Sequence, residues 1–199
     1  IHCKGLAFPA HDPRAYNSMA LGYATSNRGA CHLQAFSHPF ERNLSMPEVG
    51  LEQPADRFAV EGKAGMVARL QDIMCLFDSL ALCKFLLFGH VGPSLLLEWL
   101  NLVTGWDLKL PEMMQAGERA FNLKRMFNVA CGISRKDDVL PPRISFQRRG
   151  EGGAPQNLPP MERVLADYSE VRGWSDEGIP TAAKLQELGI AGLVAGVNV

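Results

Sequence analysis

The sequence of 199 residues predicts an all-α, multihelical fold. Apolar residues recur at helical spacing in several segments, and proline and glycine stand where helices would begin and end. Alternation of apolar and polar residues, which is typical of strands, never extends beyond a few positions. A chain of this length can bury a sizeable core. We therefore expect residues 1–199 to form one helical domain.

The first two helices are predicted from capping signals and from spacing. Asp12 and Pro13 resemble an N-cap followed by proline at the first helical position, which predicts a helix over 13–25 after an extended entry. Residues 58–77 repeat apolar side chains on one face. The opposite face, which we expect to be solvated, carries Glu61, Lys63, Arg69, Gln71 and Asp72.

Further helices are bounded by proline or glycine and are predicted over 94–103, 110–129, 161–171 and 182–188. Gly105 ends the first of these. The apolar residues that this helix is expected to bury are Leu95, Leu96, Trp99, Leu102 and Val103.

Two long loops join the helices. Residues 37–57 contain three prolines and little periodicity, which predicts a loop that can line a substrate entrance. Residues 132–153 include Asp137 and Asp138, which allow a metal-site interpretation. No histidine or second acidic cluster accompanies them, so turn residues are the favoured interpretation. The helix predicted over 110–129 carries four charged residues, for which a solvated face is the favoured interpretation: Glu118, Arg119, Lys124 and Arg125. The alternative is that one of the two arginines steers cofactor phosphates.

The composition argues against several functional classes. The formal net charge is −1 and no basic block is present, so nothing indicates a nucleic-acid surface. No apolar run approaches the roughly 18 residues that a membrane span needs. The most apolar region, 70–102, is interrupted by Asp78, Lys84, His90 and Pro93.

The cysteines occur singly, at Cys3, Cys31, Cys75, Cys83 and Cys131. Their odd number argues against a disulfide framework, and the absence of a Cys-x-x-Cys pair argues against a self-contained zinc or iron–sulfur site. A reducing, cytoplasmic location is therefore expected. The chain begins at Ile1 with no signal peptide, which favours a fragment or a processed piece of a longer protein.

Chemically, the most unusual stretch is residues 78–85 (Asp-Ser-Leu-Ala-Leu-Cys-Lys-Phe), because it places a carboxylate five residues before a thiol among apolar neighbours. Burying a charge is unfavourable unless a partner compensates it. From the residues alone, Asp78 could simply end a helix or cap the next one, and Cys83 could be a small buried hydrophobe.

A second unusual stretch is residues 25–32 (Thr-Ser-Asn-Arg-Gly-Ala-Cys-His). Its polar residues form a turn, in which Gly29 suits a positive φ. We expect Cys31 and His32 to start the next element and to face a cleft. From the residues alone, a surface or hydrogen-bonded core histidine is the favoured interpretation for His32, as it is for His11 and His38.

Both stretches resemble motifs of the tungsten-containing aldehyde ferredoxin oxidoreductases. Residues 78–83 are similar to the second pterin-binding motif of that family, Asp-x-x-Gly-Leu-Cys, with Ala81 in place of glycine. Residues 25–32 match its Thr-Ser-Asn-Arg-Gly-Ala-Cys-His segment. Residues 104–107 match its Thr-Gly-Trp-Asp turn, which implies that Trp106 acts as an aromatic plug. Family-like strings occur from Lys4 to Gly189, so the resemblance covers nearly the whole chain and implies the fold of the family's C-terminal domain.

The resemblance implies roles for four residues. Asp78 and Leu82 would position the pterin, and Cys83 would be the last of four thiolate ligands of a 4Fe–4S cluster. His32 would act as acid or base, or orient the substrate carbonyl. Tungstopterin (or molybdopterin) would hold its metal through dithiolenes, without a protein ligand. The implied reaction oxidises an aldehyde and water to a carboxylic acid, and two electrons leave through the cluster to ferredoxin.

The resemblance also implies an incomplete site. The family's N-terminal β-rich domain, its Cys-x-x-Cys-x-x-x-Cys trio and its first pterin motif, Asp-x-x-Gly-Asp, are not among these residues. We expect the chain to be inactive alone and to need the N-terminal domains or a partner subunit. Two alternatives stay open. One is a family member with another substrate, and the other is a cofactor-free helical interaction module. The departures from the family pattern at Ala7, Ala81 and Ser175 favour the module slightly.

Overall fold

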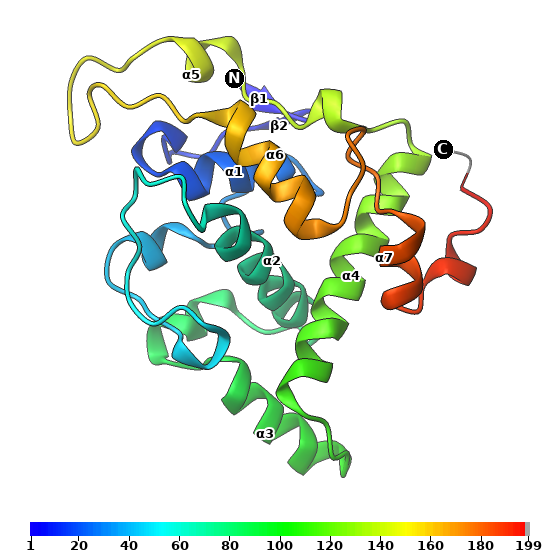
Figure 1. Ribbon diagram of the computed structural model, residues 1–199. Helices are drawn as coiled ribbons and strands as arrows, with labels where there is room; N and C mark the ends of the chain where they lie inside the picture. Colours follow the sequence, from blue (N-terminus) through cyan, green and yellow to red (C-terminus); the bar gives the residue numbers. More distant parts are fainter. Residues whose placement is uncertain (198–199) are drawn as a thin grey trace.

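A computed structural model describes residues 1–197, and it confirms the predicted all-α, multihelical class (Figure 1). The last two residues of the predicted domain 1–199 lie outside the described range. The short strands β1 (His2–Cys3) and β2 (Leu6–Ala7) pair antiparallel, with Cys3 opposite Leu6. The α-helices are α1 (Asn17–Thr25), α2 (Lys63–Ser79), α3 (Pro93–Thr104), α4 (Leu110–Ala130), α5 (Pro142–Phe146), α6 (Met161–Arg172) and α7 (Ala182–Glu187). Within residues 1–197, no helix combines the length and apolar character needed to cross a bilayer.

Helix α2 is the centre of the molecule and packs against α1, α4 and α6 (Figure 1). Its apolar residues divide between two core clusters, one shared with α1 and α6 and the other with α3 and the start of α4. The predicted solvated face is therefore wrong for three of its members. Lys63, Gln71 and Asp72 are buried because neighbouring elements cover that side of the helix.

Each buried polar residue of α2 has a polar partner elsewhere in the chain, which offsets the cost of its burial. Lys63 pairs with Glu41. The Gln71 side chain accepts a hydrogen bond from the Tyr168 hydroxyl at 2.6 Å. Asp72 pairs with Arg172 of α6 at 2.7 Å.

The first two predicted helices have different boundaries in the structure. The Asp12 side chain accepts from the Arg14 amide and caps a short 3-10 helix, η1 (Pro13–Ala15). Extended backbone at Tyr16 then separates η1 from α1, so the predicted helix 13–25 is two helices. Helix α2 begins later than predicted because Gly62, its N-cap, is left-handed.

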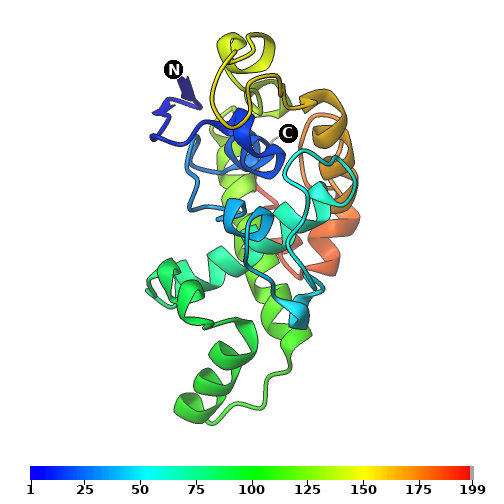
Figure 2. The same cartoon turned by 90° about the vertical axis from the view of Figure 1, so that its left-hand side faces the viewer.

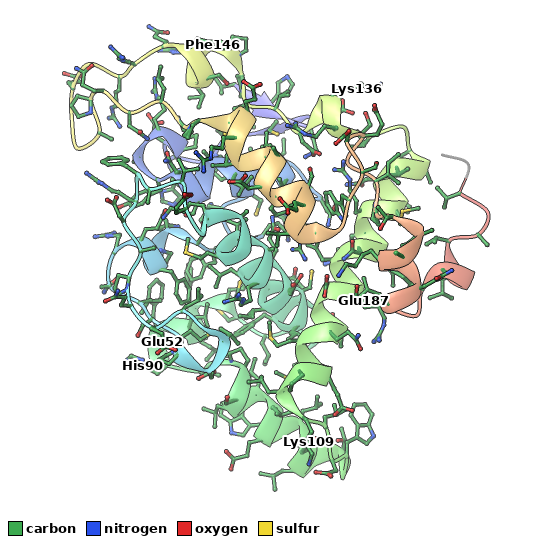
Figure 3. The ribbon with its side chains drawn as sticks, viewed as in Figure 1. Glu52, His90, Lys109, Lys136, Phe146 and Glu187 are labelled. Carbon is green, nitrogen blue, oxygen red and sulfur yellow. The ribbon has the colours of Figure 1, made fainter. Side chains whose placement is uncertain are left out.

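Burial in α3 is the clearest error of the sequence-based prediction. The helix has nearly the predicted bounds and ends at a left-handed Gly105. It buries Leu96, but Leu102 and Val103 are 75% and 86% exposed, and Trp106 is 59% exposed rather than an aromatic plug. The reason is positional: α3 and the start of α4 project from the body (Figures 1 and 2), with Lys109 at their far end (Figure 3).

Two charged residues expected at the surface form a buried ion pair. Arg125 of α4 donates two hydrogen bonds to Asp138, both at 2.9 Å, and Lys4 lies 2.6 Å from the same carboxylate. The Trp174 ring lies 4.7 Å from the guanidinium. The prediction of turn residues is right for Asp137, which accepts from the Ser134 amide, and wrong for Asp138.

Candidate functional site

The turn that carries His32 follows directly from the end of α1. Gly29 has φ +92°, and a side chain there would collide with the carbonyl of Cys3, so only glycine lets the chain pass at this point. His32 then lies in an irregular turn closed by the Phe36 amide, which donates to the His32 carbonyl at 2.9 Å. The expectation that Cys31 and His32 start a regular element is therefore wrong.

His32 is one of three neighbouring imidazoles from separate segments. The ring centroid of His11 lies 4.4 Å from that of His32, edge to face, and the ring of His38 lies 5.6 Å from that of His11. Burial and the neighbouring His11 lower the pKa of His32. Stronger burial, with His11, His32 and Arg42 nearby, lowers the pKa of His38 to about 4.

These shifts keep His32 and His38 neutral at pH 7, so each has one ring nitrogen able to accept a proton. The Nδ1 atoms of both rings are buried and have no hydrogen-bond partner within the part of the chain that the structure describes. His32 therefore has the state that a proton acceptor needs.

Asp78 lies in the last turn of α2, as predicted, and its side chain remains 35% exposed. Its Oδ1 atom lies 2.8 Å from the Lys84 ammonium. Its Oδ2 atom has only longer contacts, to the Gln34 amide at 3.4 Å and to the Lys124 ammonium at 3.7 Å. A carboxylate has about four acceptor positions, so Oδ2 retains capacity for an external N–H donor.

The chain reverses direction between Asp78 and Cys83 through a left-handed residue. Ala81 has φ +55°, a conformation that glycine adopts freely and alanine adopts at a cost. The Leu82 amide then donates to the Phe77 carbonyl at 2.9 Å. This reversal places Leu82 half-buried at the edge of a core cluster and Cys83 at the surface.

Cys83 differs from most of the other cysteines in its exposure. All five thiols are free, but Cys3, Cys31 and Cys75 are buried, whereas Cys83 and Cys131 are exposed. Three apolar side chains close to Cys83 in the sequence are also exposed, with exposed fractions of 36% for Leu80, 57% for Phe85 and 53% for Phe88. The segment 80–88 thus exposes both a thiol and apolar side chains.

The structure places the His32 turn and the segment 78–83 side by side. The carbonyl of Leu33 accepts from Lys84 at 3.0 Å, and the Gln34 amide reaches toward Asp78. The Phe36 ring lies 5.8 Å from the Phe85 ring and 5.5 Å from the Phe88 ring. The His32 ring itself packs against the rings of His11 and His38.

Sequence patterns missed Lys84, Gln34, His11 and His38 as neighbours of the site. All four contact residues distant in sequence, and single-residue chemistry rarely gives a sign of such a contact. Only Lys84 left a signal, because a lysine within an apolar run needs a partner.

The residues present fit part of a cofactor site rather than a whole one. The exposed, free thiol of Cys83 suits one ligand of an iron–sulfur cluster, and the open Oδ2 of Asp78 suits the N–H groups at the edge of a pterin. No group of three or more potential metal ligands occurs among residues 1–197. A complete cluster would therefore need ligands from additional polypeptide.

Comparisons with known proteins identify a family and several relatives of this chain. The family model described as "Aldehyde ferredoxin oxidoreductase, domains 2 & 3" matches residues 1–190. The tungsten-containing aldehyde ferredoxin oxidoreductase of Pyrococcus furiosus is 36% identical over 191 residues, which cover 94% of this chain and 30% of that protein. The protein of the same name from Thermococcus kodakarensis is 34% identical, with the same coverage.

A more distant relative is the P. furiosus "Aliphatic sulfonate oxidoreductase, WOR-like subunit", 25% identical over 201 residues, with 96% of this chain and 28% of that protein covered. The chain thus spans about 30% of the length of the curated relatives it matches.

Proposed function

Because the chain belongs to the aldehyde ferredoxin oxidoreductase family, we propose that it is the C-terminal helical part of an enzyme that oxidises aldehydes to carboxylic acids. The proposed cofactors are a tungsten- or molybdenum-bearing pterin and a 4Fe–4S cluster, and the proposed electron acceptor is ferredoxin. The observation that carries the proposal is the exposed carboxylate of Asp78 and the exposed thiol of Cys83, five residues apart and beside the His32 turn.

Asp78, Leu82 and Cys83 would hold the cofactors. Asp78 would accept hydrogen bonds from the pterin edge through Oδ2, and Leu82 would lie against the ring system. Cys83 would supply one thiolate to the cluster, as the free and exposed state of its thiol permits. When bound, the metal and the cluster supply the two-electron oxidation and the path for the electrons.

His32 would handle a proton. Oxidation of R-CHO and H2O to R-COOH releases two protons and two electrons, so a base near the substrate is required. The lowered pKa of His32 leaves its imidazole neutral and able to accept one of these protons. The same ring could donate a hydrogen bond to the substrate carbonyl and orient it.

The site would be completed by polypeptide outside this chain. A 4Fe–4S cluster takes four thiolates in the usual case, and Cys83 and Cys131 are the exposed ones among residues 1–197. The exposed Leu80, Phe85 and Phe88 would be covered when that polypeptide, from N-terminal domains or a partner subunit, packs over Cys83. The five free cysteines fit a reducing compartment such as the cytoplasm.

A direct test supplies the isolated chain with tungstopterin, iron, sulfide, an aldehyde and a viologen dye. No dye reduction is expected, because the chain holds only part of the site. Restoring the missing polypeptide should produce aldehyde-dependent reduction. Reduction by the isolated chain would contradict the incomplete-site proposal, and no activity in the completed enzyme would contradict the proposed reaction.

The second candidate is a cofactor-free helical interaction module that keeps the family fold. Left-handed Ala81 favours it, because its methyl group occupies a place where the family motif has glycine. Metal and pterin analysis of the protein, purified without oxygen from its natural source, separates the two candidates. Absence of tungsten, molybdenum, iron and pterin would favour the module.

A further inference from the structure

Lys84 is a buried cation at the boundary between the two parts of the candidate site. Its side chain is only 9% exposed. Its ammonium lies 2.8 Å from Oδ1 of Asp78 and donates to the Leu33 carbonyl at 3.0 Å. A buried ammonium is unfavourable unless its charge and its donors are satisfied. These two contacts therefore fix where the side chain lies.

The contacts of Lys84 join three features that the sequence separates. Leu33 follows His32 in the irregular turn, Asp78 ends α2, and Lys84 itself follows Cys83 and begins the 3-10 helix η4 (Lys84–Gly89). One side chain thus ties the His32 turn to the segment that carries both proposed cofactor-binding groups. The Gln34 side chain also connects the His32 turn to Asp78, but at 3.4 Å this contact is longer than a typical amide–carboxylate hydrogen bond.

We propose that Lys84 is a positioning residue: it fixes the His32 turn against residues 78–83 and holds one positive charge on the residue that follows the Cys83 ligand position. The identity of the cofactors in this inference rests on the proposed function, whereas the link between the two segments does not.

Two consequences follow from this placement. The Lys84 ammonium occupies Oδ1 of Asp78, which leaves Oδ2, with its longer contacts, as the acceptor for a ring N–H. A fixed positive charge near a cluster ligand stabilises the reduced cluster, which carries the more negative charge. Lys84 should therefore raise the reduction potential of a cluster held by Cys83.

Lys124 provides a matched control for these effects. It is a lysine near the same carboxylate, at 3.7 Å from Oδ2, and its side chain is 42% exposed. Among residues 1–197, its polar contacts are to Asp78 and to the Cys75 sulfur, and neither lies in the His32 turn. Removing Lys124 changes the charge near Asp78 without cutting the proposed link.

The first test is amide hydrogen exchange in the protein with Lys84→Met, Lys84→Arg or Lys124→Met. Lys84→Met should speed exchange in residues 31–36 and 78–83 together, on the order of tenfold, because both segments lose the shared contact. Lys84→Arg should restore most of the protection, and Lys124→Met should leave it unchanged. Lys84→Gln is measured alongside, so that the comparison survives if Lys84→Met does not fold.

Unchanged exchange, a change in only one segment, or an equal change in Lys124→Met would overturn the link.

The second test measures the midpoint potential of the cluster in the completed enzyme. Lys84→Met should move it to a more negative value and Lys84→Arg should restore it, whereas an unchanged potential would overturn the electrostatic role. If the unaltered enzyme assembles no cluster, the proposed function fails, and the exchange result still decides whether Lys84 links the two segments.

Discussion

The body around α2 and the surface around Cys83 both contain many apolar side chains. They differ in how completely the rest of the chain covers those side chains. In the body, buried charges meet buried partners, as in the pairs Asp72–Arg172 and Arg125–Asp138. On the Cys83 surface, a thiol and the rings of Phe85 and Phe88 remain exposed. The charges of the first region are paired within the chain, whereas the second region leaves a thiol and apolar rings exposed to solvent.

The projecting helix α3 belongs with the Cys83 surface in this comparison. Its Leu102 and Val103 side chains are 75% and 86% exposed, and large exposed apolar patches often mark interaction sites. The relatives are more than three times as long as the matched region, and we propose that further polypeptide covers these exposed side chains.

The largest stability effect should come from breaking a buried pair in the body. Arg125→Met leaves the Asp138 carboxylate buried with Lys4 as its remaining charged partner. The free energy of unfolding should fall by about 3–5 kcal/mol. The control, Lys109→Met, removes an exposed pair with Asp107 and should cost less than about 1 kcal/mol. Denaturant unfolding measures both, and equal losses would show that the body does not depend on paired burial.

An intermediate effect is expected from acid. The pKa of His38 is lowered to about 4, against an ordinary value of 6.5. The unfolded chain therefore binds a proton between these values that the folded chain does not, so stability is present above pH 6.5 and falls as the pH drops toward 4. The loss should be on the order of 1–2 kcal/mol, because partial exposure of the ring screens the effect.

His38→Gln should flatten this part of the pH profile, measured by denaturant unfolding at several pH values. The exposed His2→Gln serves as the control variant. A profile for His38→Gln with the same slope as that of the unaltered protein would show that the buried imidazole is not responsible for the acid sensitivity.

The smallest effect concerns the strained turn of the Cys83 surface. Ala81→Gly should stabilise the fold by about 0.5–1 kcal/mol, because relief of left-handed strain exceeds the added entropy of the unfolded chain. Ala116→Gly, in the interior of α4, should instead cost about 1 kcal/mol. Thermal unfolding compares the two. Destabilisation by Ala81→Gly would mean that the alanine is not strained there.

The sequence predicted the fold class and most helix ends, because local signals such as Asp12, Gly105 and the proline-initiated helices set them. It did not predict burial in α2 or exposure in α3, since both depend on what packs against a helix rather than on its own periodicity. The interpretation of Arg125 as solvated was wrong for the same reason: its partner Asp138 comes from a different element.

For the candidate site, the resemblance selected His32, Asp78, Leu82 and Cys83, and the structure places their segments side by side. Their roles stay predictions. Lys84 and the imidazoles of His11 and His38 could not be found from spacing, because their contacts cross between segments that are far apart in the chain.

The central claim is that the surface around Cys83 forms the part of a cofactor site that this chain contributes. Iron analysis of the completed enzyme tests this claim most directly. Cys83→Ala is compared with Cys131→Ala, which removes the other exposed thiol, and with Cys75→Ala, which removes a buried one. The account predicts that Cys83→Ala loses or damages the 4Fe–4S cluster, while the other two variants keep the iron content of the unaltered enzyme. Equal iron content in all three variants would contradict it.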